Sequence, residues 1–260
     1  MAAIFIRSSF LFIFVVSVSW KLSEEYDWLD ILYNNAFGFF DVISLCCSAV
    51  AMLYTRISDV SSIMFNEPIP AAIMACIFFG ESFDIIDGAL AITNGIGLVL
   101  ICKISMDNSE HPDESSLFGI ILSFGSLLCG TVVAIIGRAL AHRNKADPSL
   151  MLVMVAFNGV IWPSIYLSVT SSWSLPTKGH DLLISLLLGL VTAFSAYAFT
   201  KLLKTENALL ATISLTLCIP LTFFYDVLFK RRIVVWQTAL GACLTIGSTI
   251  CLYVKNYQFT

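Results

Sequence analysis

Charge is the scarcest property of this sequence. Only 12% of its 260 residues are Asp, Glu, Lys or Arg, whereas 58% are hydrophobic and the mean hydropathy is +0.89. Soluble domains have about a quarter of their residues charged. A water-soluble fold of this size is therefore excluded, and the surface of the protein is expected to face lipid.

Signatures of catalysis and metal binding are missing as well. There is no GxSxG, HExxH or phosphate-binding glycine loop, and the three histidines lie in polar connections, so the sequence gives an enzyme no support. All eight cysteines fall inside long apolar runs and none lies in a loop, so we expect no disulfides. They form no CxxC pair or Cys/His cluster, so we expect no metal, and no cofactor is expected either. A net charge of −4 without a basic stripe argues against nucleic acid.

Long uncharged runs take up most of the chain. A helix rises 1.5 Å per residue, so about 20 apolar residues cross a hydrocarbon core of about 30 Å. The runs are Ile4 to Trp20, Ile31 to Tyr54, Ile57 to Phe79, Ile85 to Cys102, Leu117 to Ile136, Leu150 to Val169, Leu182 to Phe199, Ala208 to Phe229 and Val234 to Val254. They predict an all-α integral membrane protein with about nine transmembrane helices. The first run, which contains Arg7, has an alternative interpretation as a secretory signal peptide.

An acidic stretch divides these runs into two groups. We predict a first repeat at 1–103, a linker at 104–116 and a second repeat at 117–255, because proline-bearing and glycine-rich runs recur at an offset of about 150 residues. Repeats that insert upside down relative to each other have odd numbers of helices. Five runs follow the linker and four precede it, so the first of the two inverted repeats is expected to lack its opening helix.

The order of several short motifs resembles a known family. Phe79-Gly80-Glu81, Gly88-Ala89-Leu90 and Gly95-Ile96-Gly97-Leu98 are similar to the end of the EamA-like repeat of the drug/metabolite transporter superfamily. The resemblance to the G branch of the solute-carrier 35 family is carried by Ser58-Asp59-Val60-Ser61, Trp173-Ser174-Leu175-Pro176, Gly189-Leu190 and Thr200-Lys201. It implies ten helices in two five-helix inverted repeats. The chain departs from the pattern at Asn34-Asn35-Ala36 and at Lys230-Arg231.

Glu67 is the principal candidate for a binding residue. An ionisable group within the hydrocarbon costs several kcal/mol unless it is paired or hydrated. Glu67 directly precedes Pro68 and lies close to Pro70, and proline removes an amide donor and frees nearby carbonyls. We interpret Glu67 as a proton-coupling or substrate-binding carboxylate; the alternative is a structural hydrogen-bonding residue or a protonated carboxyl.

Three further polar residues are candidates for the same role. Asp41 and Asn35 fall in the run Ile31 to Tyr54, and interhelical hydrogen bonding is the alternative for both. Lys201 follows Leu182 to Phe199 and would suit an anionic solute or, alternatively, the membrane interface. Pro68, Pro70 and Pro220 are the expected helix breaks, and we expect the segments around them to face a shared central cavity.

The function expected from this pattern is secondary transport of a small polar metabolite by alternating access. The rival hypothesis is a non-transporting membrane protein that binds or regulates a partner. Expected partners are the solute, the lipid bilayer and, as one option, a second copy of the chain in a homodimer. The expected location is an endomembrane (ER or Golgi) or the plasma membrane.

Overall fold

The structure, a computed structural model, describes the chain in seven long stretches. The described residues are 27–55, 57–64, 66–80, 85–107, 114–143, 148–169 and 236–258, together with residues 6, 8, 9, 13, 183, 184, 187, 189–191, 194, 195, 197, 198 and 228. All the elements in these stretches are α-helices, and no strand occurs among the described residues. The all-α fold class is therefore confirmed.

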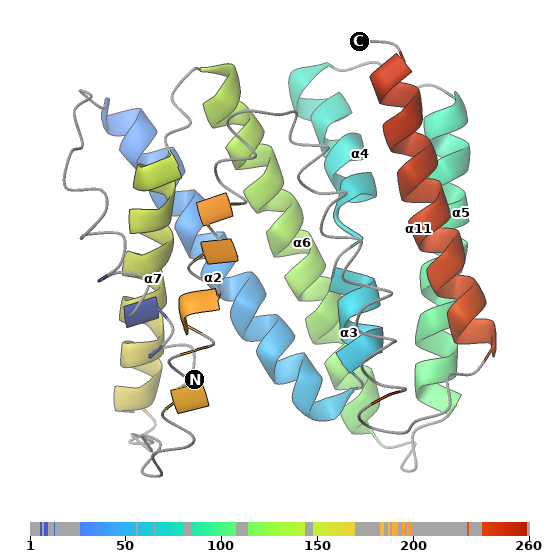
Figure 1. Cartoon of the computed structure of the whole chain (residues 1–260), viewed down its shortest axis with the longest axis horizontal. Helices are drawn as coiled ribbons and strands as arrows, with labels where there is room; N and C mark the ends of the chain where they lie inside the picture. The colour runs from blue at the N-terminus through green and yellow to red at the C-terminus, as the bar shows by residue number, and fades with distance from the viewer. Residues whose placement is uncertain are drawn as a thin grey trace. The chain divides into compact units, whose positions relative to one another are not determined.

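The helices follow the apolar runs of the sequence closely (Figure 1). They are α2 (Trp28–Tyr54), α3 (Ile57–Met64), α4 (Pro68–Phe79), α5 (Ile85–Asp107), α6 (Glu114–His142), α7 (Pro148–Val169) and α11 (Trp236–Gln258). The predicted runs at 4–20, 182–199 and 208–229 lie mostly outside the described residues, so the number of nine helices stays a prediction.

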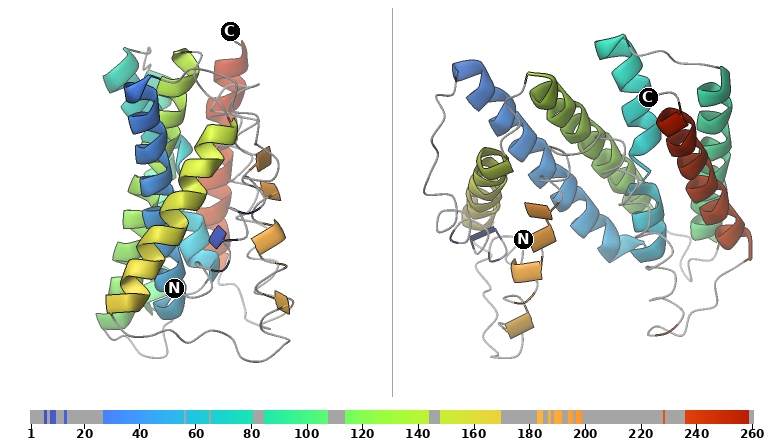
Figure 2. Two further views of the ribbon diagram at one scale, coloured as in Figure 1. Left: turned by 90° about the vertical axis from the view of Figure 1, so that its left-hand side faces the viewer. Right: turned by 45° about the horizontal axis from the view of Figure 1, so that its top comes forward.

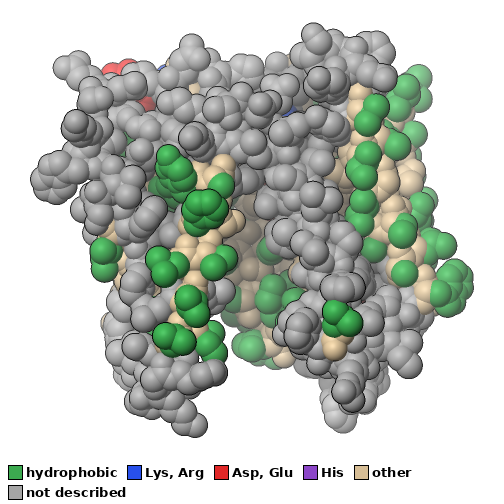
Figure 3. Space-filling model, viewed as in Figure 1, with side chains coloured by type: hydrophobic (Ala, Val, Ile, Leu, Met, Phe, Trp, Pro, Cys, Tyr) green, Lys and Arg blue, Asp and Glu red, His purple; other side chains and the backbone are tan. Residues whose placement is uncertain are grey.

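Four helical segments are long and apolar enough to cross a membrane. Among the described residues these are Trp28–Tyr54, Asp59–Phe78, Leu117–Leu140 and Leu150–Val169. Large hydrophobic side chains are exposed on the described helices, and on the face drawn in Figure 3 they line α11. Trp236, the first residue of α11, is 69% exposed. An outward apolar surface of this kind is stable only against lipid or another apolar partner.

The chain forms two compact units, and each unit takes residues from both sides of the acidic linker. The first consists of Met1–Cys46 and Ile136–Ala208, and the second of Cys47–Ile135 and Leu209–Thr260. Compact packing is thus not confined to one half of the sequence. The predicted repeats, which concern sequence order and not packing, stay a prediction.

In the first unit, α2 and α7 approach closely at a glycine. A Cβ placed on Gly38 would overlap the carbonyl of Met154, so only a bare backbone fits there. Such contacts are the usual way in which membrane helices gain close packing. This approach brings the N-terminal part of α2 alongside the middle of α7.

In the second unit, α5 and α11 lie side by side, as Figure 1 and the right view of Figure 2 show. Gly97 of α5 lies against the carbonyl of Gly241 and the side chain of Thr245 on α11. At the start of α6, Phe118 stacks edge-on against Tyr54 with ring centroids 5.3 Å apart. Ile63, Ile120 and Leu127 form an apolar core between α3 and α6.

Candidate functional site: an interrupted membrane span

The third apolar run folds as two short helices instead of one. The span Asp59–Phe78 contains α3, which ends at Met64, and α4, which begins at Pro68. In a continuous helix, residues 68 and 70 would donate their amides to the carbonyls of residues 64 and 66. Proline has no amide proton, so Pro68 and Pro70 remove both bonds, and both sit comfortably in the first turn of a new helix. The loss of these two bonds explains why α3 does not continue into α4.

Glu67 lies in this break, immediately before α4. Its backbone carbonyl accepts the amide of Ala71 at 2.9 Å, and its side chain is partly buried without capping the helix. The position is favourable for a carboxylate, because the N-terminus of a helix carries a partial positive charge. Proline occupies two of the first three positions of α4, so few backbone donors remain there for an external anion.

A glycine on α6 provides the space for the Glu67 carboxyl. A Cβ built on Gly130 would overlap Oε1 of Glu67, so the carboxyl rests directly on the α6 backbone. Gly130 is buried, whereas Gly125, one and a half turns earlier, has open space around it. The position of Glu67 therefore depends on the absence of a side chain at residue 130.

Three buried polar groups join the break to α5 and α11. Asn94 of α5 donates an Nδ2 hydrogen to Oδ1 of Asn66 and also lies 3.3 Å from Oγ of Ser248 on α11. Asn66, Asn94 and Ser248 are 1%, 2% and 4% exposed. Nδ2 of Asn66 has no hydrogen-bond partner within the described part of the chain. Because a buried donor without a partner costs about 1–3 kcal/mol, this amide is suited to an added acceptor.

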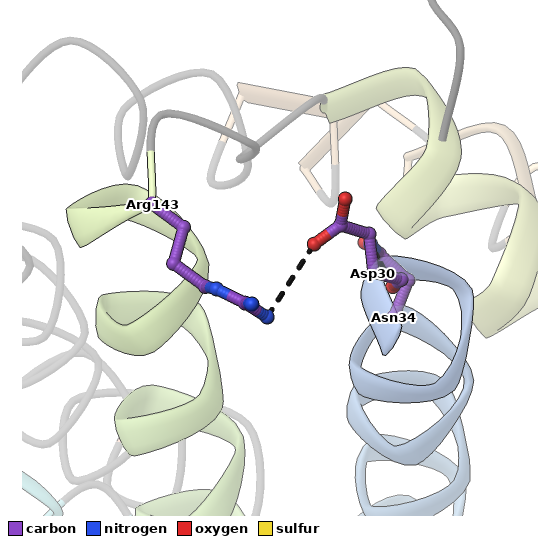
Figure 4. A network of polar contacts seen from close by, with 3 residues as sticks. All are labelled: Asp30, Asn34 and Arg143. Atoms are coloured by element: carbon purple, nitrogen blue, oxygen red, sulfur yellow. Dashed lines mark hydrogen bonds and ion pairs between the residues drawn. The ribbon is translucent and has the colours of Figure 1, made fainter. Parts of the chain in front are cut away.

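A second polar cluster lies at the end of the first unit (Figure 4). Arg143, just after α6, lies 3.5 Å from Oδ1 of Asp30 and places its guanidinium over the ring of Tyr33 at 5.6 Å. Asn34 donates to the Asp30 carbonyl at 2.7 Å. Asp30 is almost fully buried, while the Arg143 side chain is 45% exposed. The pair holds the start of α2 against the end of α6.

The two sequence candidates in α2, Asn35 and Asp41, differ in exposure, and Asn35 also differs from its neighbour Asn34. Asn34 is fully buried, whereas Asn35 is exposed and accepts a hydrogen bond from Nδ2 of Asn158 on α7 at 2.9 Å. Asp41 is half-buried and has an interaction partner. Consecutive helical residues differ by about 100° in direction, which explains why Asn34 and Asn35 point to different surroundings. Lys201 and Pro220 lie outside the described residues.

Several polar residues of these clusters were not singled out from the sequence. Their partners are remote along the chain: Asn94 and Ser248 are 154 residues apart, and Asn35 and Asn158 are 123 apart. The available signal was the rarity of asparagine within apolar runs, since a buried amide requires a partner. Among the described residues no group of three or more His, Cys, Asp or Glu side chains could hold a metal ion.

Fold and site together define a multi-pass α-helical membrane protein with an interrupted, polar-lined span. Residues 1–103 match the profile of the EamA-like transporter family. The resemblance to the drug/metabolite transporter superfamily, and within it to the solute-carrier 35 family, is confirmed by this match and by the relatives described next.

Two relatives and one solved structure resemble most of the chain. Solute carrier family 35 member G1 of Mus musculus is 26% identical over 221 residues, which cover 81% of this chain and 60% of that protein. An uncharacterised vacuolar membrane protein of Saccharomyces cerevisiae is 26% identical over 154 residues, covering 57% of this chain and 39% of its own. A protein of known crystal structure has a TM-score of 0.67 at 12% identity, covering 95% of this chain and 86% of its own, which shows a shared fold alone.

The chain spans about three fifths of the length of the mouse relative. Neither relative is named as an enzyme. The expectation of a multi-pass integral protein of an endomembrane or the plasma membrane is confirmed by the family match, these relatives and the apolar helices.

Proposed function

We propose that this chain carries the solute site of a secondary transporter, and that a small polar metabolite binds at the break between α3 and α4. The supporting observation is the interruption itself, because a membrane span that stops at its polar centre places free backbone groups and a carboxyl within the hydrocarbon region. Such groups are stable only beside protein, water or a solute.

The side chains at the break would have different roles in solute binding. The Glu67 carboxylate would bind a proton or a hydrogen-bond donor of the solute, and the free Nδ2 of Asn66 would bind an acceptor. Asn94 and Ser248 hold Asn66 in place from two other helices. Movement of one repeat against the other around such a site would expose it to each side of the membrane in turn.

Replacement of Glu67 by Gln tests this assignment. The two side chains are nearly isosteric, so Glu67→Gln removes the charge and keeps the shape. In proteoliposomes that contain the purified chain and are supplied with a metabolite panel, uptake of the transported solute should fall at least about tenfold, while the thermal unfolding temperature stays near that of the wild type.

Asp27→Asn is the matched control, because it makes the same change of charge at an exposed position just before α2. It should leave uptake unchanged. Normal uptake in Glu67→Gln would exclude a coupling role and reduce Glu67 to a structural residue. Absence of uptake for every solute would instead favour the rival function, a membrane protein that binds or regulates a partner.

A further inference from the structure

The first unit contains a directed chain of hydrogen bonds that the proposed function does not use. The indole Nε1 of Trp162 donates to Oδ1 of Asn158 at 3.2 Å, and Nδ2 of Asn158 donates to Oδ1 of Asn35 at 2.9 Å. The same Nδ2 also donates to the Met154 carbonyl at 2.9 Å. Both bonds between side chains are donated in the direction of Asn35, so the Nδ2 hydrogens of Asn35 are the donors left at the end of the series.

The two ends of this series of hydrogen bonds are exposed, and its middle residue is buried. Asn158 is only 5% exposed, whereas Trp162 is 45% exposed and Asn35 is also exposed. Nδ2 of Asn35 has no hydrogen bond to any other residue that the structure describes. The buried amide therefore fixes an exposed indole and an exposed amide donor in one arrangement.

The depth of these groups argues against an ordinary lipid-facing surface. Asn158 lies eight residues from the start and eleven from the end of the span Leu150–Val169, so it is about 12 Å or more from either end. An exposed amide donor at this depth would lack a partner in hydrocarbon, at a cost of several kcal/mol. Asn35 must therefore face water or a polar ligand.

The indole has the wrong orientation for an interfacial anchor. Tryptophans of the membrane interface lie near the headgroups, where the indole N–H can reach water. Trp162 lies near the middle of its span and turns its N–H inward to Asn158. Phe39 contacts it edge-on with ring centroids 5.3 Å apart, which restrains the ring. What remains accessible on Trp162 is apolar ring surface.

We propose that Trp162 and Asn35 form a subsite for a solute with a planar ring that carries a hydrogen-bond acceptor at its edge. The ring would stack on the indole, and the acceptor would receive the free Nδ2 hydrogens of Asn35. Asn158 is a positioning residue that sets the orientation of both groups. Gly38 contributes by allowing α2 and α7 to approach closely enough for the bond between Asn35 and Asn158.

Fluorescence of Trp162 provides a direct test that needs no transport assay. The sequence contains five tryptophans, and replacement of Trp20, Trp28, Trp173 and Trp236 by Phe leaves Trp162 as the only tryptophan, whose emission is excited selectively over that of tyrosine. Nicotinamide, uracil and adenine supply planar rings with edge acceptors, and propionamide supplies an acceptor without a ring. We expect a saturable change of emission with at least one ring probe and none with propionamide.

Substitutions separate stacking from hydrogen bonding in the unmodified chain. Measured by equilibrium dialysis with the radiolabelled ring probe, Asn35→Leu and Trp162→Ala should each weaken binding about tenfold or more, whereas Trp162→Phe, which keeps a ring, should weaken it less. Phe157→Ala is the matched control, because Phe157 is an equally exposed aromatic residue of α7 that takes no part in the hydrogen bonds between Trp162, Asn158 and Asn35. It should have no effect.

Two results would overturn the proposal. One is the absence of saturable binding for all three ring probes to the wild-type chain, and the other is equal binding by wild type and Asn35→Leu. The proposal rests on the proposed function only for its biological meaning. Ring-probe binding that depends on Asn35 and Trp162 would support the subsite even if Glu67→Gln left transport unchanged.

Discussion

The two compact units place polar groups in their membrane helices in different ways. In the first unit, α7 continues through Pro163 without a break, and the ion pair of Asp30 and Arg143 lies at helix ends. In the second, α3 ends at Met64 and α4 begins at Pro68, so Asn66 and Glu67 lie between two helices within one span. The comparison shows that the number and position of prolines decide whether a membrane helix stays whole.

The physical difference lies in how many hydrogen bonds each proline removes. Pro163 removes one amide donor from the interior of α7, the one that would reach the Gly159 carbonyl, and the helix nevertheless continues to Val169. Pro68 and Pro70 remove two donors within three residues. A single lost bond leaves a continuous helix, whereas two neighbouring losses favour a break that can host a side chain such as Glu67.

The largest effect is expected from filling the space beneath Glu67. Gly130→Ala should displace the carboxyl, destabilise the protein by about 1–3 kcal/mol and lower transport by roughly 10- to 100-fold. Thermal unfolding in detergent and proteoliposome uptake measure the two effects. Gly125→Ala, made where space is open, should change neither.

A second substitution distinguishes displacement of Glu67 from general damage to α6. Glu67→Asp shortens the side chain by one methylene, so Glu67→Asp combined with Gly130→Ala should unfold at a higher temperature than Gly130→Ala alone. If the double variant is the less stable of the two, contact between Glu67 and residue 130 does not explain the loss.

The charged pair of the first unit should show an asymmetric response. Arg143→Gln leaves the buried Asp30 carboxylate without its cation and should cost about 1–2 kcal/mol, below the value for fully buried pairs because Arg143 is 45% exposed. Asp30→Asn leaves only a half-exposed arginine and should cost about 1 kcal/mol or less. The free energies of unfolding of the two variants measure these costs. A cost for Asp30→Asn that equals or exceeds that for Arg143→Gln would contradict this account.

The smallest effect is expected for the bond between α5 and α11. Ser248→Ala removes the hydroxyl beside Asn94 and should cost about 0.5 kcal/mol, the usual value for an interhelical hydrogen bond in membranes. Ser123→Ala is the control, because the Ser123 hydroxyl bonds the Gly119 carbonyl of its own helix. The difference between the two variants in unfolding free energy estimates the interhelical bond, and no difference would mean that it contributes nothing.

The apolar runs predicted the helices well because a membrane span is a local property of the sequence. The runs Ile31 to Tyr54 and Leu150 to Val169 fall within α2 and α7 almost to the residue. The choice of Pro68 and Pro70 as helix-break candidates rests on an equally local property, the loss of an amide donor, and it stays a prediction. These features depend on residues a few positions apart.

The contacts of the candidate sites could not be predicted in the same way. The position of the Glu67 carboxyl depends on Gly130, which lies 63 positions later. The orientation of Trp162 depends on its hydrogen bond to Asn158, which in turn bonds Asn35. Which residues come into contact in such pairs depends on helix rotation and interhelical packing, and the hydropathy of the sequence predicts neither. Asn34 and Asn35 illustrate this: identical neighbours in the sequence have opposite burial.

The contact between α5 and α11 has a consequence for biosynthesis. Asn94 enters the membrane long before Ser248 is translated, and Gly97 likewise enters long before its packing partner Gly241 is synthesised. During this interval the newly inserted α5 presents an amide and a bare backbone groove, both of which attract unrelated membrane helices. Synthesis of α11 therefore completes the packing of α5, and nascent chains that stop before α11 should be preferred clients of membrane chaperones and quality-control proteases.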